Sequence, residues 1–584
     1  MCALPICATF IAICSFLPLY LAPASVAEIV KPLFVVLAVS LGLSWILALC
    51  QTTTFGNFIL KEAVPGGAMK DPYDTKLYHK FEKFLTLLIK RRFVTLTTVF
   101  VTLVLSLVIM AVMPQSFFPK MNKPYFRADL VFPEGFSIHA VDQDVMKVEG
   151  YLKNHEKVKS YSVTLGGTPL RYYLASSSFG PKSNYANVMV ETKDPEDAAE
   201  VEQQFYEHMT QNFPNIITRS ALFALSPVPE AAIEIGFIGE NPDTLTALVE
   251  RAKKIARQCD MVTDIRSNWG DKVPVWKPMF SQQKGLRLGI TRQQVANSFR
   301  TATNGLPLGE YREGDVSLPI LLKDEDVEKM NLNDVKSVPV FSTKGNSVKV
   351  EQVIDNFALG YDYNVVRRFN RERCMMMQCE PKRGANTMAA FKQVLTAVQE
   401  QMRLPEGYKM KYFGEQETQD VSNAALAKNI PLTFLLIYVV LLFLFPSNYR
   451  KPVLIMLMLP LVFIGVVWGL LLFGKSLDFF AILGLLGLIG MNIKNAIVLV
   501  DEIGLQLKDG KGAVPAVVEA TKTRIVPVTM ASGTTILGML PLLGDAMFAG
   551  MAATIMGGLF VSTVLTIFVL PVTYCIFFKI RADR

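Results

Sequence analysis

Long apolar stretches alternate along this chain with polar connections and one large polar segment. Crossing a bilayer as a helix takes roughly 20 apolar residues, and eight stretches approach or exceed that length. We therefore predict eight transmembrane helices, at Leu4–Leu21, Ile29–Cys50, Phe93–Met113, Ile430–Phe445, Pro452–Phe473, Phe479–Val500, Ile525–Leu543 and Met551–Phe578. Between the third and the fourth lies a polar insert of about 315 residues, Pro114–Asn429, which is long enough for two or more domains.

The first apolar stretch has an alternative interpretation. Leu4–Tyr20 is followed by the small residues of Ala22–Ala27, which resembles a signal peptide with its cleavage site. Such peptides begin with positive residues, and none precedes Leu4. We therefore interpret this stretch as a membrane helix.

Strand–helix–strand units recur within the insert. Such units build ferredoxin-like split βαβ domains, in which helices cover one side of a sheet. The predicted fold class is an α-helical membrane bundle of about eight transmembrane helices with a large α+β insert. Val275–Arg373 has one clear helix, Thr291–Ala302, and is interpreted as an inserted domain. The four predicted units, each given in the order strand, helix, strand, are Phe126–Phe132, Val141–Asn154 and Val158–Leu165; Asn187–Glu191, Asp197–Asn212 and Ile216–Arg219; Ala231–Ile238, Pro242–Arg257 and Val262–Asn268; and Met375–Glu380, Thr387–Met402 and Tyr408–Phe413.

Positive residues in the short connections set the orientation of the bundle. Connections on the other side carry only Lys31 and Lys475, so we predict that both termini are cytoplasmic and that the insert is outside. The net charge of +8 therefore reflects topology, and nothing favours nucleic-acid binding. The basic residues on the cytoplasmic side are Lys61, Lys70, Lys76, Lys80, Lys83, Lys90, Arg91, Arg92, Arg450, Lys451, Lys508, Lys511, Lys522, Arg524, Lys579, Arg581 and Arg584.

Composition agrees with this division. Hydrophobic residues make up 51% of the chain and charged residues 19%, whereas ordinary soluble proteins reach about 25% charged. The predicted parts are two transmembrane helices in residues 1–50, a cytoplasmic linker in 51–92, a transmembrane helix in 93–113, the insert in 114–429 and a five-helix bundle in 430–584.

The eight cysteines are spread along the chain and predict no disulfide framework. The run Cys374–Cys379 (CMMMQC) has the thiols and thioethers that select soft metals such as Cu(I). In a strand, however, alternate side chains face opposite ways, which splits the run between two faces. We interpret the run as core packing, with a soft-metal efflux site as the alternative, and assign no metal ligands.

Lys494 is the most informative residue of the predicted sixth helix. Gly484, Gly487, Gly490 and Lys494 recur at spacings of three and four and so share one face. Small residues let helices approach closely in lipid, which predicts that Lys494 faces protein. A charge at mid-membrane costs at least ~2.5–3.5 kcal/mol, so a partner or a function is expected. The alternative is that Lys494 snorkels to the interface.

The seventh helix is predicted to open with Arg524. Ala531, Thr535 and Gly538 share its face, and Ser532 lies beside them. Taken alone, Arg524 is typical of a positive anchor at the cytoplasmic boundary.

Two runs in these helices resemble motifs of the resistance-nodulation-division pumps, in the hydrophobe/amphiphile or AcrB-like branch. Lys494–Asp501 (KNAIVLVD) is similar to the tenth-helix motif of that family. Arg524–Ser532 (RIVPVTMAS) with Gly538–Leu542 (GMLPL) is similar to the eleventh. The resemblance covers the chain from the family's fifth helix onward and includes an amphipathic linker helix, Leu77–Lys90.

The resemblance implies a transporter driven by the proton gradient, without a cofactor, and not an enzyme. In the family a lysine on the tenth helix pairs with two aspartates on the fourth, and Lys494 matches that lysine. Arg524 matches an arginine that helps proton access, and Asn495 lies beside the lysine. Where the family often has a threonine this chain has Ala531, so Ser532 or Thr535 is the expected substitute.

The resemblance also implies the organisation of the insert and its partners. Porter subdomains are expected at Tyr125–Ala221 and at Leu222–Gly270 with Met375–Gln416, interrupted by a docking domain near residues 271–374. The expected assembly is a homotrimer in the bacterial inner membrane with a periplasmic adaptor and an outer-membrane channel, exporting small amphiphilic substrates. The family's gate between binding pockets falls on the loop Ala175–Tyr185, with candidate residues Ser178, Phe179 and Gly180; a plain surface loop is the alternative.

The family's first four helices and first external domains are missing here. No predicted helix contains Asp or Glu, so the chain lacks the proton acceptor and is expected to need a separate amino-terminal half. A non-transporting truncated fragment is the alternative. A related protein-translocation motor is disfavoured, because such motors have much smaller inserts.

Overall fold

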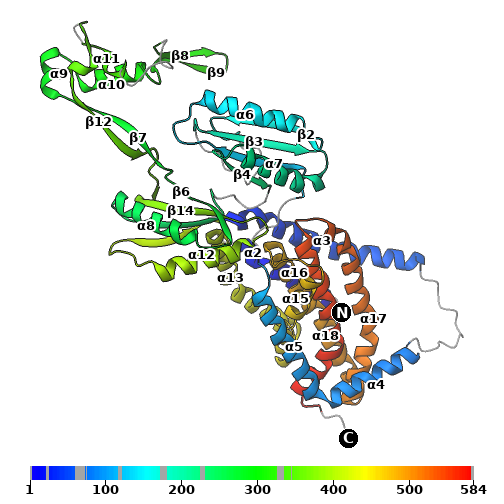
Figure 1. Ribbon diagram of the computed structural model, residues 1–584. Coiled ribbons are helices and arrows are strands. Elements are labelled where there is room, and N and C mark those ends of the chain that lie inside the picture. The colour runs from blue at the N-terminus through cyan, green and yellow to red at the C-terminus, as the bar shows by residue number, and fades with distance from the viewer. Residues whose placement is uncertain are drawn as a thin grey trace. The chain divides into compact units, whose positions relative to one another are not determined.

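The computed structural model describes residues 3–21, 25–59, 73, 75–115, 122–170, 181–223, 230–324, 334–342, 345–446 and 448–580. They belong to two compact units (Figure 1). One comprises Met1–Asn268 and Arg368–Arg584, and it holds the membrane helices and two α+β subdomains. The other is Trp269–Arg367, which is inserted within the second subdomain.

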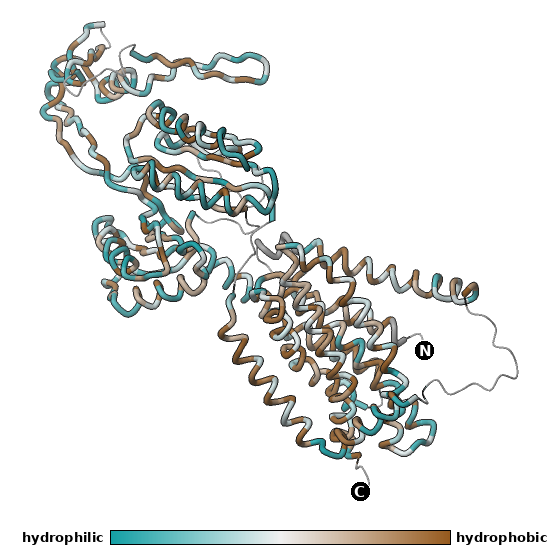
Figure 2. The backbone as a smooth tube through the Cα atoms, turned by 45° about the vertical axis from the view of Figure 1, so that its right-hand side comes forward, coloured by the Kyte–Doolittle hydropathy of each residue, from teal (hydrophilic) through white to brown (hydrophobic). Residues whose placement is uncertain are grey.

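Seven helices within the described ranges are long and apolar enough to cross a membrane, and Figure 2 shows hydrophobic residues dominating this part of the backbone. Several extend beyond the apolar stretch because polar residues continue the helix outside lipid. Thus α13 begins at Gly414 instead of Ile430, and α16 continues past Val500 to Lys508. The seven are α3 (Ser25–Ile59), α5 (Arg92–Val112), α13 (Gly414–Leu444), α14 with α15 (Arg450–Leu457 and Val462–Leu472), α16 (Phe479–Lys508), α17 (Ala513–Met539) and α18 (Ala549–Phe577).

The first apolar stretch differs from its prediction as a single helix. It forms α1 (Ala3–Ser15) and the short α2 (Leu17–Leu21), with a break at Phe16. Pro18 explains the break, because proline cannot donate a backbone hydrogen bond and its ring clashes with the carbonyl four residues earlier, so it is tolerated in the first turn of a new helix and not inside α1. α1 packs against α13 and α16 and is part of the bundle.

Small residues allow α15 and α18 to approach closely. A Cβ atom at Gly465 would lie 2.6 Å from the carbonyl oxygen of Gly557, and one at Gly469 would lie 2.7 Å from that of Ala553. Close backbone contact of this kind holds membrane helices together where the hydrophobic effect cannot. α18 also packs against α16 and α17, so it lies at the centre of the bundle.

The first α+β subdomain has the predicted split βαβ topology. Its four strands form an antiparallel sheet in the order β2-β3-β1-β4. β1 alternates between buried and half-buried residues, and its buried side chains, such as Phe126, pack under α6 and α7. The elements are β1 (Tyr125–Val131), α6 (Ile138–Lys153), β2 (Val158–Leu165), β3 (Tyr185–Thr192), α7 (Ala198–Asn212) and β4 (Ile217–Leu222).

The second subdomain repeats this arrangement. β14 pairs with both β5 and β6, and β5 pairs with β15, so the strand order is again second, third, first, fourth. α8 and α12 pack against β14. The elements are β5 (Ile233–Ile238), α8 (Pro242–Ala256), β6 (Val262–Ser267), β14 (Glu372–Pro381), α12 (Thr387–Gln401) and β15 (Lys409–Phe413).

The inserted unit is built on a two-stranded stem, β7 (Lys272–Phe280) with β12 (Ile354–Tyr363). Its predicted helix is α10 (Arg292–Thr301), which starts with a capping box formed by Thr291 and Gln294. The helix α9 (Gln282–Leu288) precedes α10. After α10 come the hairpin of β8 (Leu306–Glu313) and β9 (Val316–Leu322), the helix α11 (Asp334–Ser337), and the strands β10 (Pro339–Phe341) and β11 (Ser347–Lys349).

Candidate functional site

Lys494 lies in α16, with its side chain exposed on the chain's own surface. The glycines that share its side of the helix are buried: a Cβ atom at Gly487 would lie 2.9 Å from Phe16, and one at Gly490 2.9 Å from Ala12 of α1. The prediction that Lys494 faces protein is therefore wrong for this chain, because α1 covers the glycines but leaves the lysine uncovered. Within the described part of the chain, Lys494 has no ion-pair partner.

Buried polar residues link α16 and α17 to α18. Ser562 of α18 donates a hydrogen bond of 2.5 Å to the buried Asn492 of α16. Thr563, also on α18, donates one of 2.7 Å to the buried Ser532 of α17. Asn495 is half-buried. Ser532 therefore lies in a buried contact between helices.

Thr535 and Ala531 complete the α17 positions that the sequence singled out. Thr535 donates its hydroxyl to the backbone carbonyl of Ala531 in its own helix, 3.0 Å away. Ala531 itself is exposed. Of the two candidates for the missing threonine, Ser532 is thus the one that contacts a neighbouring helix.

Arg524 forms an ion pair with Glu502 of α16, a residue that sequence reasoning missed. Its Nε and Nη2 atoms donate to Glu502 Oε2 at 3.1 and 2.5 Å. Gln506 donates to the other carboxylate oxygen at 2.9 Å. The prediction that α17 opens at Arg524 is wrong, because buried residues such as Val517 continue the helix back to Ala513. Antiparallel pairing of the two helices would have indicated Glu502, which lies two residues after the end of the predicted stretch at Val500.

The Cys374–Cys379 run lies in the core of the second subdomain. Met375, Met377 and Cys379 are fully buried on one face of β14, and Cys374 is buried on the other beside Phe413. Burial raises the pKa of the Cys374 thiol to about 11 and that of Cys379 to about 12. Since the thiolate is the form that binds metals, the environment favours the interpretation as core packing.

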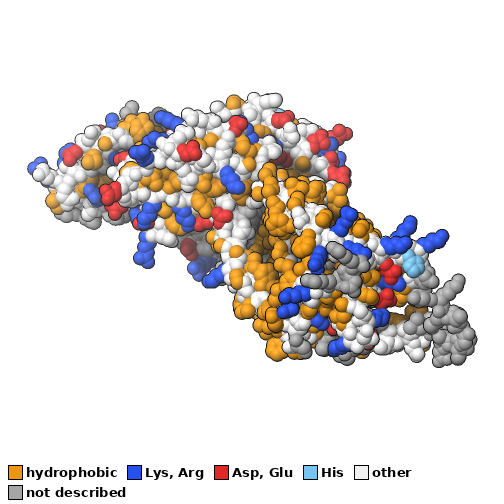
Figure 3. Space-filling view, turned by 90° about the horizontal axis from the view of Figure 1, so that it is seen from below, with side chains coloured by type: hydrophobic (Ala, Val, Ile, Leu, Met, Phe, Trp, Pro, Cys, Tyr) orange, Lys and Arg blue, Asp and Glu red, His pale blue; other side chains and the backbone are white. Residues whose placement is uncertain are grey.

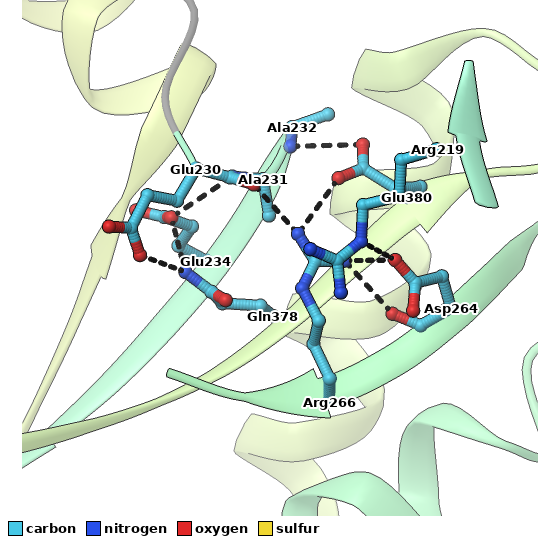
Figure 4. Close-up of polar contacts among 9 residues, drawn as sticks. All are labelled: Arg219, Glu230, Ala231, Ala232, Glu234, Asp264, Arg266, Gln378 and Glu380. Atoms are coloured by element: carbon cyan, nitrogen blue, oxygen red, sulfur yellow. Dashed lines mark hydrogen bonds and ion pairs between the residues drawn. The ribbon is translucent and has the colours of Figure 1, made fainter. Parts of the chain in front are cut away.

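A second polar site joins the two subdomains (Figure 4). Arg219 of β4 donates to Asp264 of β6 at 2.6 Å. Arg266 also contacts Asp264 and reaches Glu380 of β14 at 3.2 Å and the backbone carbonyl of Glu230 at 2.7 Å. Asp264 has a φ of 46°, a left-handed conformation that non-glycine residues adopt at a cost in strain. The network thus holds the start of the second subdomain against the last strand of the first.

Glu234 is buried beside this network. Gln378 donates to its carboxylate at 2.8 Å and the backbone amide of Ala231 at 3.2 Å. Burial outweighs these bonds and raises the pKa of Glu234 to about 7, with the nearby Glu230 adding to the shift. Burial also raises the pKa of Glu380 above its usual range. This region therefore holds carboxyl groups that bind protons at unusually high pH.

Arg383 makes another contact between the subdomains. Its two terminal nitrogens donate to the two carboxylate oxygens of Glu202 on α7, at 2.8 and 2.6 Å. The guanidinium also lies over the ring of Tyr206, 4.1 Å from its centre. Paired bonds of this geometry are directional, and here they link the segment after β14 to α7. The candidate gate residues Ser178, Phe179 and Gly180 lie outside the described residues.

Comparison with known proteins agrees with this architecture. Residues 3–578 match the AcrB/AcrD/AcrF family. The nickel and cobalt resistance protein CnrA of Cupriavidus metallidurans is 27% identical over 360 residues, which are 60% of this chain and 33% of that protein. The swarming motility protein SwrC of Bacillus subtilis is 22% identical over 99% of this chain and 54% of its own length. The multidrug export protein AcrF of Escherichia coli is 24% identical over 80% of this chain and 46% of its own length.

A solved structure shares the fold. A heavy metal efflux pump, in its crystal form II, superposes with a TM-score of 0.78 at 17% identity, covering 98% of this chain and 58% of that one. The chain thus spans about half the length of the relatives that it matches along its whole length. It is a multi-pass membrane protein with an extramembrane α+β domain. With the match extending over nearly all of its residues, the chain belongs to the AcrB/AcrD/AcrF family of resistance-nodulation-division transporters, of which it is a half-length member.

Proposed function

We propose that this chain is the carboxyl-terminal half of a proton-driven efflux transporter, and that Lys494 couples proton movement to export. The observation that supports this is the exposed position of Lys494 on a membrane helix, without an ion-pair partner in the described part of the chain. A lysine at membrane depth is costly unless it is paired. Its counter-charge is a carboxylate from outside this chain, supplied by an amino-terminal half.

Arg524 and Ser532 have supporting roles in this proposal. The Arg524–Glu502 pair lies toward the Lys508 end of α16, with Glu502 eight residues beyond Lys494. There protons would pass between the relay and the cytoplasm. Ser532 and Asn495 position α17 and α16 around Lys494. A homotrimer with a periplasmic adaptor and an outer-membrane channel completes the proposed assembly.

Small amphiphilic compounds are the proposed substrates. The multidrug export protein among the relatives favours them, while the cobalt and nickel resistance protein keeps a metal-efflux function as a second candidate. The buried, protonated thiols of β14 argue against soft-metal export through that run.

Proton-driven export in inverted membrane vesicles tests the proposed role of Lys494. We expect the chain to export a fluorescent amphiphile only when an amino-terminal half with membrane carboxylates is co-expressed. Lys494→Ala should abolish that export at normal membrane abundance. Lys494→Arg should be poor as well, because a planar guanidinium does not replace a compact ammonium.

Lys508→Ala is the matched control, since Lys508 is an exposed lysine at the end of the same helix. It should leave export unchanged. Normal export by Lys494→Ala would refute the relay and leave Lys494 as a snorkelling residue. Export of Co²⁺ or Ni²⁺ in place of the amphiphile would favour the metal-efflux function, and failure to export either would favour a non-transporting fragment.

A further inference from the structure

The helix α4 (Lys76–Lys90) precedes the membrane helix α5 and packs across one end of the bundle (Figure 1). Leu85 and Ile89 are buried in the bundle's hydrophobic core. Phe81 and Phe84 contact the ring of Phe568 on α18, with ring centres 5.6 and 5.5 Å apart. One face of α4 is thus fixed to the protein.

The opposite face of α4 is strongly basic. The one acidic residue of α4, Glu82, forms an ion pair of 3.2 Å with Lys522 of α17. Glu82 therefore does not neutralise the exposed positive charges of α4. Among the described residues, none of the exposed cations forms an ion pair. These cations are Lys76, Lys80, Lys83, Lys90 and Arg91.

Apolar side chains accompany these cations. Leu77 is 72% exposed, Phe84 50% and Leu87 47%. Residues seven apart lie almost in line along a helix, so Lys76, Lys83 and Lys90 form one row and Leu77 and Phe84 form another, about 100° around the helix. Lys80 and Leu87 lie between the two rows. Exposed lysines alternating around a helix with exposed apolar residues are typical of a helix that lies in a membrane interface.

The position of α4 in the chain agrees with an interfacial location. Only Arg91 separates it from α5, which starts at Arg92. Arg92 donates to the backbone carbonyl of Ile580, at 3.4 Å, beyond the end of α18. Figure 3 shows Lys and Arg side chains beside the broad hydrophobic surface of the bundle. The carboxyl end of α4 is therefore at the boundary of the lipid.

We propose that the exposed face of α4 binds anionic phospholipid headgroups of the cytoplasmic leaflet. Lys76, Lys80, Lys83 and Lys90 contact the phosphates, while Leu77 and Leu87 enter the acyl boundary beneath them. Anionic lipid supplies the negative charge that the described protein surface does not. This binding is independent of transport and holds whether or not Lys494 carries protons.

Hydrogen exchange of the α4 amides in the purified full chain tests the proposal. The chain is placed in nanodiscs of phosphatidylcholine alone or mixed with phosphatidylglycerol. Each lysine near an anionic surface contributes ~1 kcal/mol, a factor of roughly five. We expect exchange to slow at least about fivefold in the anionic nanodiscs, and the difference to shrink in high salt.

Two variants separate the contributions. Lys80→Gln with Lys83→Gln and Lys90→Gln should strongly reduce the lipid difference, leaving the part that belongs to Lys76 and Arg91. Leu77→Gln with Leu87→Gln should speed exchange in both lipids.

The control is Lys153→Gln with Lys254→Gln and Lys392→Gln, which removes three exposed lysines from helices of the α+β subdomains and should keep the lipid difference. Exchange in α18 reports that each variant is folded. Equal α4 exchange in both lipids, or a lipid difference that is undiminished in the first variant, would overturn the proposal.

Discussion

The surroundings of Arg524 and Lys494 in the structure differ from those that the sequence alone predicts. Arg524 resembles a boundary anchor, yet it is paired with Glu502, while Lys494 resembles a packed residue and is exposed. Both differences have one cause: a single helix reveals spacing, but the partner of a charge comes from a neighbouring helix. The motif therefore identified the residues to examine without identifying what each contacts.

The buried Glu234 should make the second subdomain less stable as pH rises. Its pKa of about 7 lies above the ordinary 4.5, so the folded state binds the extra proton, and this stabilisation is lost between those values. The shift corresponds to about 3 kcal/mol. Amides of β5 in the full chain should exchange faster at pH 8 than at pH 5, after correction for intrinsic rates.

Glu234→Gln should reduce that dependence, because an amide oxygen still accepts the bond from Gln378 but the amide cannot ionise. The part that remains belongs to Glu380 of β14, whose pKa burial also raises. Glu230→Gln is the control: Glu230 is exposed and is a smaller cause of the shift than burial. A pH dependence that is undiminished in Glu234→Gln would contradict the assignment.

Among the elements, those with a strong apolar pattern were predicted most completely. The membrane helices and the two split βαβ sheets follow from stretches of about 20 apolar residues and from alternating strands. Helix ends were missed where polar residues continue the helix, as in α16 beyond Val500 and α17 before Ile525. The contacts between the subdomains could not be predicted, because Arg219, Asp264 and Arg383 are ordinary surface charges in the sequence.

Gly557→Ala should separate α15 from α18. A Cβ atom there would lie 2.4 Å from the Cα atom of Gly469, and backbone cannot yield as a side chain does. We expect a lower thermal unfolding midpoint and lower membrane abundance. Gly538→Ala on α17 is the matched control, since nothing lies within 4 Å of its Cβ position. It should be neutral or stabilising by up to about 1 kcal/mol, from helix propensity. Equal loss in both variants would show that close packing is not the cause.

For the whole molecule, the distribution of positive charge and the structure suggest one arrangement relative to the membrane. The basic helix α4 and the ends of α16 and α18 belong to connections rich in Lys and Arg, whereas the α+β subdomains follow α5 on the opposite side. The Lys/Arg bias sets orientation because cytoplasmic connections retain positive charge.

Reporter fusions to truncated chains should reveal this arrangement. A fusion after Lys70 or Lys508 should be active with a cytoplasmic reporter, and one after Ser267 with a reporter that folds only outside. Lys508 lies at the end of α16, after five of the seven long helices, so its fusion tests the bundle as well as the insert. Three fusions on the same side would exclude a membrane-crossing α5. A cytoplasmic Ser267 would place both α+β subdomains inside the cell, where export toward an outer channel has no route, and would overturn the proposed function.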